Sequence, residues 1–150
     1  MENCVEKIYC CGRDNNENAL AAAILANNNN NNRYGYGYLI LANGAIHQLW
    51  PDSEISNGVQ GYNSSAINIE YIGGIDKNGE AIDNRTNEQK QSLIRLLLAL
   101  RKKYPEAKIL GHRDFSPDTD GDGIVEPHEW TKMCPCFDAK EEYKDLLSWR

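Results

Sequence analysis

The sequence has no long apolar run. No stretch reaches the ~18 consecutive apolar residues that a membrane-spanning helix needs. No basic segment followed by an apolar run opens the chain, as a secretion signal would require. We therefore expect a soluble, cytoplasmic protein.

Positive charge is also scarce. The 16 lysines and arginines are outnumbered by 22 aspartates and glutamates, which gives a formal net charge of -6 and a sequence pI near 5.1. An acidic chain of this kind is not a general binder of nucleic acid or of an anionic membrane surface. The composition therefore argues against those two classes of partner.

The cysteines do not suit a disulfide framework. They number five, an odd count. Without a secretion signal they are better interpreted as free thiols or metal ligands. The 150 residues suit a single domain spanning 1–150, long enough to bury roughly two-thirds of its unfolded surface.

Strand patterns dominate the first half of the chain. Residues 5–10, 36–42, 45–50 and 65–72 are predicted strands, the last with its apolar residues alternating toward one face. Asn43 and Gly44 predict a hairpin on a type I′ turn, because both accept the positive φ angles of that turn. Residues 17–26 favour a helix, and six asparagines at 27–32 then end it in a surface loop.

The second half favours helices. Thr86 and Gln89 form a capping box at a helix start. Four leucines then share one helical face: Leu93, Leu96, Leu97 and Leu100. After a short buried strand at 108–110, a final amphipathic helix is expected over 138–149, with an apolar face of Tyr143, Leu146 and Leu147. The whole pattern predicts an α/β fold, a central mixed β-sheet flanked by helices.

Most of the residues suited to metal chemistry lie between 111 and 139. His112 ends the apolar strand, and Cys134 follows 22 positions later. A neutral imidazole and a thiolate are good zinc ligands, and a third protein ligand with one open position would make a catalytic site. Isolated histidines and cysteines are also common as structural residues, so the residues alone leave both interpretations open.

Residues 117–130 contain a second metal-binding pattern, which we interpret as an inserted loop of the EF-hand type. It offers calcium ligands at positions 1, 3, 5, 7 and 12 of the twelve-residue pattern: Asp118, Asp120, Asp122, the backbone carbonyl of Ile124, and Glu129. Gly123 stands where the chain must turn sharply. The alternative is an acidic, solvated loop.

Seven segments follow one another in a distinctive order: Gly35-Tyr36-x-Tyr38, Asn43-Gly44-x-Ile46, Gly61-Tyr62-Asn63, Gly73-Gly74-x-Asp76, Thr86 with Gln89, Gly111-His112-Arg113-Asp114 and Lys132-x-Cys134-Pro135. In this order they resemble one family, the zinc-dependent N-acetylmuramoyl-L-alanine amidases, which include phage lysozymes and animal peptidoglycan-recognition proteins. The resemblance covers nearly the whole chain and implies the same fold, a mixed sheet flanked by helices.

The resemblance also implies a site. His112 and Cys134 match two zinc ligands, and Cys10, or Cys11 if the register slips by one, stands where the family has its third ligand, a histidine. Tyr36 and Lys132 match the residues that position the attacking water and stabilise the oxyanion as the amide between the lactyl group and L-alanine is cut. Cys136 is the substitute ligand if Cys10 does not reach the metal.

The chain departs from the family around this groove. Gly37 replaces the histidine of the usual Gly-Tyr-His, Gly58 stands near the place of another, and the Trp-His pair of the first helix is absent. Two hypotheses follow. The chain is a divergent phage-type amidase, or it is an inactive binding protein that sequesters a muropeptide or a nucleotide signal, with Asn63 and Arg113 contacting the ligand.

Overall fold

The computed structural model describes residues 7–14, 37–49 and 66–148. In this part of the chain five strands form one sheet in the order β3-β2-β4-β1-β5. Their bounds are β1 Lys7–Asp14, β2 Tyr38–Ile40, β3 Ile46–Gln48, β4 Ala66–Ile72 and β5 Lys108–Gly111. Strand β3 runs antiparallel to β2 and the other neighbours are parallel, which confirms the mixed sheet. The expected helix at 17–26 and the asparagine run lie outside the described residues.

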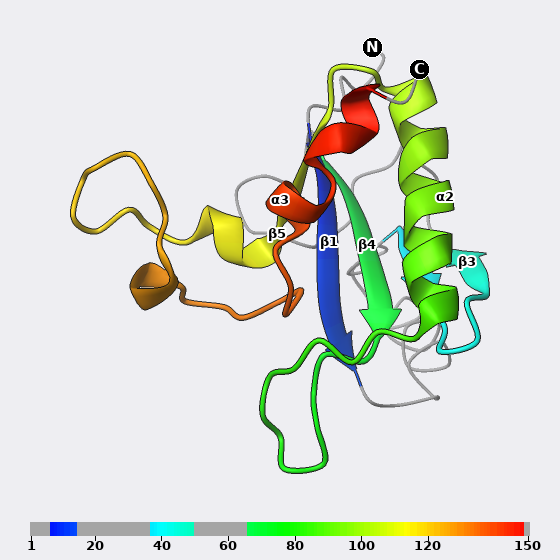
Figure 1. Ribbon diagram of the computed structural model, residues 1–150, viewed down its shortest axis with the longest axis horizontal. Helices are drawn as coiled ribbons and strands as arrows, with labels where there is room; N and C mark the ends of the chain where they lie inside the picture. Colours follow the sequence, from blue (N-terminus) through cyan, green and yellow to red (C-terminus); the bar gives the residue numbers. More distant parts are fainter. Residues whose placement is uncertain (1–6, 15–36, 50–65, 149–150) are drawn as a thin grey trace, which may run out of the picture.

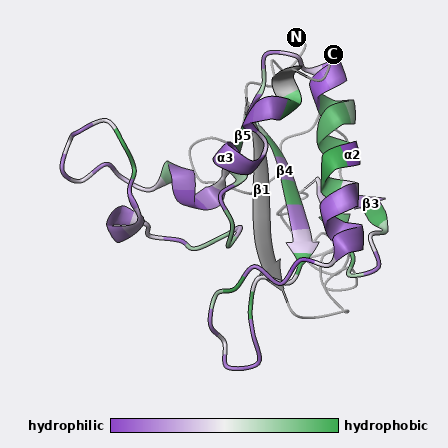
Figure 2. Cartoon of the chain, viewed as in Figure 1, coloured by the Kyte–Doolittle hydropathy of each residue, from purple (hydrophilic) through white to green (hydrophobic). Residues whose placement is uncertain are grey.

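The central strand β4 is buried on both faces. All seven of its residues are buried, including Asn68 and Glu70, and Figure 2 shows both hydrophobic and hydrophilic stretches along it. The prediction of one buried face for this segment is therefore wrong. The sequence pattern could not show that β4 has a neighbour on each side and cover on each face.

Helix α2, Asn87–Lys103, packs along the sheet (Figure 1). The capping box is confirmed, because the Thr86 side chain accepts from the Gln89 amide and the Gln89 side chain accepts from the Thr86 amide. The four predicted leucines are all buried and meet β2, β4 and β5 in one core cluster. Burial of this face against the sheet provides most of the helix's stability.

The hairpin is confirmed, but its turn is not of type I′. The Gly44 amide donates to the Leu41 carbonyl at 2.8 Å. Gly44 has a φ of 86° while Asn43 has no positive φ, so only one residue takes the left-handed conformation. This suits the longer hairpin loop, in which one glycine follows a turn.

The prediction of a single C-terminal helix over 138–149 is also wrong. The segment forms a short helix α3, Ala139–Glu142, and a separate 3-10 helix η4, Lys144–Ser148. Tyr143 between them is buried beside Phe137, at 5.9 Å between ring centroids. Leu146 is buried as expected, and the side chain of Leu147 lies outside the described part.

Two loops extend from this body (Figure 1). One follows β4 and leads to α2. The other leaves the 3-10 helix η2, His112–Phe115, and includes the short 3-10 helix η3, Pro127–Glu129. Among the residues that the structure describes, no helix is long and apolar enough to span a membrane.

Candidate metal centre

The structure brings His112 and Cys134 together. The Nδ1 atom of His112 lies 3.9 Å from the Sγ atom of Cys134. Zinc bonds of about 2.0 Å to nitrogen and about 2.3 Å to sulfur would separate the two atoms by roughly 3.6 Å at a tetrahedral angle. The pair therefore fits a shared zinc ion.

The backbone places the third candidate beside this pair. Cys10 is the register partner of Gly111, the residue before His112, across the parallel strands β1 and β5. Cys11 pairs with Glu70 on the other neighbour, β4. The side chains of β1 lie outside what the structure describes, so ligation by Cys10 stays a prediction.

Three contacts fix the segment that carries Cys134. The Arg113 amide donates to the Cys134 carbonyl at 2.9 Å, and the buried Tyr71 hydroxyl donates to the Pro135 carbonyl at 2.6 Å. A Cβ atom on Gly111 would lie 2.5 Å from Pro135 Cδ, so only glycine allows this approach. Strands β4 and β5 thus hold in place the two segments that carry His112 and Cys134.

The buried side chain of Arg85 contacts the same segment, at Phe137. The Arg85 guanidinium lies 3.3 Å from the ring centroid of Phe137 and forms ion pairs with Asp83 at 2.8 Å and Glu142 at 2.7 Å. Its hydrogen bonds lower the pKa of both carboxyl groups. The sequence analysis missed Arg85 and Tyr71, because the partners of Arg85 on α3 and of Tyr71 are 57 and 64 positions away.

The remaining candidates are the catalytic residues Lys132 and Tyr36, the ligand-binding residue Asn63 and the substitute zinc ligand Cys136. Lys132 is exposed on the segment that leads to Cys134. Tyr36 and Asn63 lie outside the described residues. The Cys136 thiol donates to the Gly74 carbonyl at 3.2 Å, and burial raises its pKa. The role of Cys136 as a substitute ligand is therefore less favourable than the sequence suggested.

The Arg113 side chain packs against Trp130. Only 8% exposed, it places its guanidinium 3.9 Å from the ring centroid of Trp130. This cation–π contact ties η2 to the far end of the 117–130 loop. A contact between Arg113 and a ligand stays a prediction.

The acidic loop turns back on itself. Asp118 accepts from the amides of Gly121 and Gly123 at 2.7 Å each. Oxygens of Asp118, Asp120 and Glu129 lie within 4.8 Å of one another, as the ligands of one cation would. Asp122 instead accepts from the Ile124 amide at 2.8 Å, and its carboxylate is not in this group.

Glu129 is the loop's buried carboxylate. Its Oε1 atom accepts from the amide and hydroxyl of Thr119, and its Oε2 atom accepts from the Glu126 amide at 2.9 Å. These bonds, that from Glu126 foremost, lower the pKa of Glu129 to about 2. His128, which the calcium pattern leaves without a role, lies 3.8 Å from both the Asp120 and the Glu126 carboxylates.

Comparison with known proteins identifies the family. The sequence profile of the N-acetylmuramoyl-L-alanine amidases matches residues 8–135, and the chain belongs to this family as a divergent member. It is 47% identical over 86 residues to an uncharacterized protein of Haemophilus influenzae, covering 57% of this chain and 74% of that one. It is 31% identical over 110 residues to the endolysin of Enterobacteria phage K11, covering 73% of this chain but only 64% of the endolysin.

Solved structures share the fold. The amidase LysC of Clostridium intestinale aligns with a TM-score of 0.64 and 24% identity, over 86% of this chain and 84% of that one. The peptidoglycan-recognition protein SA of a bumblebee aligns with a TM-score of 0.66 and 14% identity, over 95% and 81%. The expected amidase fold is confirmed.

Proposed function

We propose that the protein is a zinc-dependent amidase that cuts the bond between the lactyl group and L-alanine in peptidoglycan. The observation that carries this proposal is the 3.9 Å approach of His112 Nδ1 to Cys134 Sγ in a chain of the amidase family. Cys10 completes a Cys2His set, whose fourth position stays open for catalysis.

Each group has a chemical role. Bound zinc supplies Lewis acidity and lowers the pKa of water to about 7. Lys132 brings its ammonium toward the carbonyl oxygen on which negative charge develops, and this charge is greater in the transition state than in the substrate. The phenol of Tyr36 orients the attacking water. The contact between Tyr71 and Pro135 keeps Cys134 in place through the reaction.

Cys10→Ser and Cys11→Ser form a matched pair of variants that tests the ligand set. Successive strand residues point to opposite faces, so only one of the two thiols can point toward the metal. We expect about one zinc per chain by elemental analysis, lost in Cys10→Ser and retained in Cys11→Ser, and clearing of a peptidoglycan suspension that follows the zinc. Zinc retained in Cys10→Ser would contradict the proposed site. Zinc bound by the wild type without clearing of the suspension would contradict the proposed activity.

The second candidate is a binding protein that has lost hydrolysis. It is supported by the missing histidine at Gly37, whose amide donates to the Asn68 carbonyl in the described structure. Such a protein would sequester a muropeptide or a nucleotide in the old groove, with Arg113 and Asn63 as contacts. Native mass spectrometry distinguishes the two, because a binder retains an added muropeptide unchanged whereas an amidase releases its peptide.

We also propose that the 117–130 loop binds calcium through Asp118, Asp120, Asp122, the Ile124 carbonyl and Glu129. The grouped oxygens of three of these carboxylates support this.

Finally, the likeness to phage endolysins supports a phage protein made in the cytoplasm of its bacterial host.

A further inference from the structure

A hollow of about 370 Å³ lies between β5 and the C-terminal helices. Its walls are the end of α2, the residues of 105–110, and Lys140, Tyr143 and Lys144. None of the candidate zinc or calcium ligands lines it. The amidase proposal therefore assigns it no role.

Its charge is opposite to that of the whole molecule. Four basic residues and one acidic residue line it, Arg101, Lys108, Lys140 and Lys144 against Glu106, in a chain of net charge -6. Positive groups gathered in one hollow repel one another unless an anion lies among them. The local excess of cations thus favours an anionic occupant.

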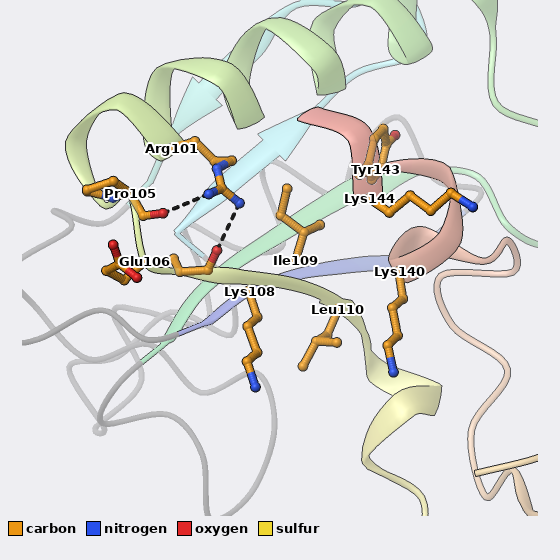
Figure 3. Close-up of a pocket in the computed structure, with 10 residues that line it drawn as sticks. Arg101, Pro105, Glu106, Lys108, Ile109, Leu110, Lys140, Tyr143 and Lys144 are labelled. Atoms are coloured by element: carbon orange, nitrogen blue, oxygen red, sulfur yellow. Dashed lines mark hydrogen bonds between the residues drawn. The ribbon is translucent and has the colours of Figure 1, made fainter. Parts of the chain in front are cut away.

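Two of these cations are already engaged. The Arg101 guanidinium donates to the Pro105 carbonyl at 2.7 Å and to the Ala107 carbonyl at 3.2 Å (Figure 3). Lys144 forms an ion pair with Glu141. The Arg101 guanidinium, which could otherwise bind a carboxylate through two hydrogen bonds, therefore already donates to backbone carbonyls.

Lys108 and Lys140 remain. In the part of the chain that the structure describes, neither ammonium has a hydrogen bond or an ion pair. Figure 3 shows the two side chains extending to the same side, with Leu110 between them. Leu110 is only partly buried, so the two charges flank a small apolar surface.

This arrangement suits a particular chemistry. Lysine binds phosphate as a point charge, whereas arginine suits bidentate contacts with the oxygens of a carboxylate or a phosphate. A phosphate monoester carries close to two negative charges at pH 7.5, which matches two free ammonium groups. A hollow of 370 Å³ falls in the lower part of the range of small-ligand sites.

We propose that Lys108 and Lys140 bind the phosphate of a small phosphorylated molecule whose apolar part lies on Leu110. The site is separate from the zinc centre. It binds in the same way whether or not the chain hydrolyses peptidoglycan.

The test is a titration followed by NMR on the intact 15N-labelled protein at pH 7.5 and low salt. The probes are inorganic phosphate, phenyl phosphate and AMP. We expect saturable shifts of the Lys108, Ile109 and Lys140 amides, with phenyl phosphate binding several-fold more tightly than inorganic phosphate. Tighter binding of AMP than of phenyl phosphate would identify a nucleotide as the source of the phosphate. The reverse order would identify a simpler phosphate ester.

The matched variants carry equal charge. Lys108→Gln with Lys140→Gln should weaken phenyl phosphate binding at least tenfold. Lys77→Gln with Lys90→Gln removes the same charge from exposed positions outside the pocket and should leave affinity within twofold. All four lysines are exposed, so both variants should fold, and thermal melting checks this. Equal weakening in the two variants, unchanged affinity in the first, or the absence of saturable shifts with all three probes would overturn the proposal.

Discussion

Tyr71 connects the core to the proposed zinc ligand Cys134. It is 1% exposed on β4 and donates its hydroxyl to the carbonyl of the residue after Cys134. Burial raises the pKa of Tyr71 well above its usual value, so the hydroxyl stays protonated and remains a donor at neutral pH. Residues that orient ligands in this indirect way commonly tune metal affinity.

We predict that Tyr71→Phe lowers zinc affinity by about tenfold, the lower end of the range for groups behind the ligands. The ring stays packed near Phe137, but the Pro135 carbonyl loses its donor. Competition with a coloured chelator measures the zinc dissociation constant. Tyr104→Phe, at the end of α2, is the control and should keep the wild-type value. An unchanged constant in Tyr71→Phe would mean that this tyrosine only fills the core.

At the level of elements, local signals predicted local structure well. Thr86 and Gln89 bond each other across three positions, so the start of α2 could be predicted from sequence. The break between α3 and η4 could not, because Tyr143 there accepts a hydrogen bond from Arg85, 58 positions away. The turn at Gly44 also packs against α2, where the Ser92 hydroxyl donates to the Gly44 carbonyl, a contact 48 positions apart in the sequence.

The 117–130 loop makes a prediction of its own. Asp120→Ala with Asp122→Ala should lower the melting temperature in calcium buffer to that of the chelated wild type. Calcium at 100 times its Kd would stabilise the fold by about 2.7 kcal/mol, or roughly 5–10 °C for a domain of this size. Differential scanning fluorimetry with and without chelator measures the shift.

The control removes the same charge from another loop. Asp76→Ala with Glu80→Ala disrupts the turn in which Asp76 accepts from the Asn78 and Glu80 amides. This variant should melt earlier but keep its calcium-dependent shift. A calcium shift that survives in the loop variant would exclude the calcium site.

At the level of the whole molecule, the sequence predicted which segments lie together. It did not predict the buried contacts that hold these segments in place. The approach of His112 to Cys134 across 22 positions followed from the resemblance to the amidases. Arg85, which joins the loop after β4 to α3, has no signal in its neighbours, because its environment exists only in the folded chain. Long-range burial of a charge cannot be read from a local pattern.

The acid stability of the fold depends on three hydrogen-bonded carboxylates, of which Glu129 is buried. The pKa of Glu129 is about 2 against a usual 4.5, and the pKa values of Asp83 and Glu142 are lowered in the same direction. A carboxyl group whose pKa is lower in the folded state stabilises the fold above its unfolded pKa. That contribution is lost as the pH falls through the folded value. In calcium-free buffer the free energy of unfolding should therefore decrease as the pH falls from 4.5 toward 2.

Glu129→Gln isolates one part of this effect. A glutamine keeps an oxygen acceptor but cannot take up the proton, so the variant should be less stable than wild type at pH 7 and lose less stability between pH 4.5 and 2. Urea unfolding at a series of pH values measures both. Glu80→Gln, at an exposed position, should reproduce the wild-type dependence. If Glu129→Gln and wild type showed the same slope below pH 4.5, the amides of Thr119 and Glu126 would not be holding a charged carboxylate in solution.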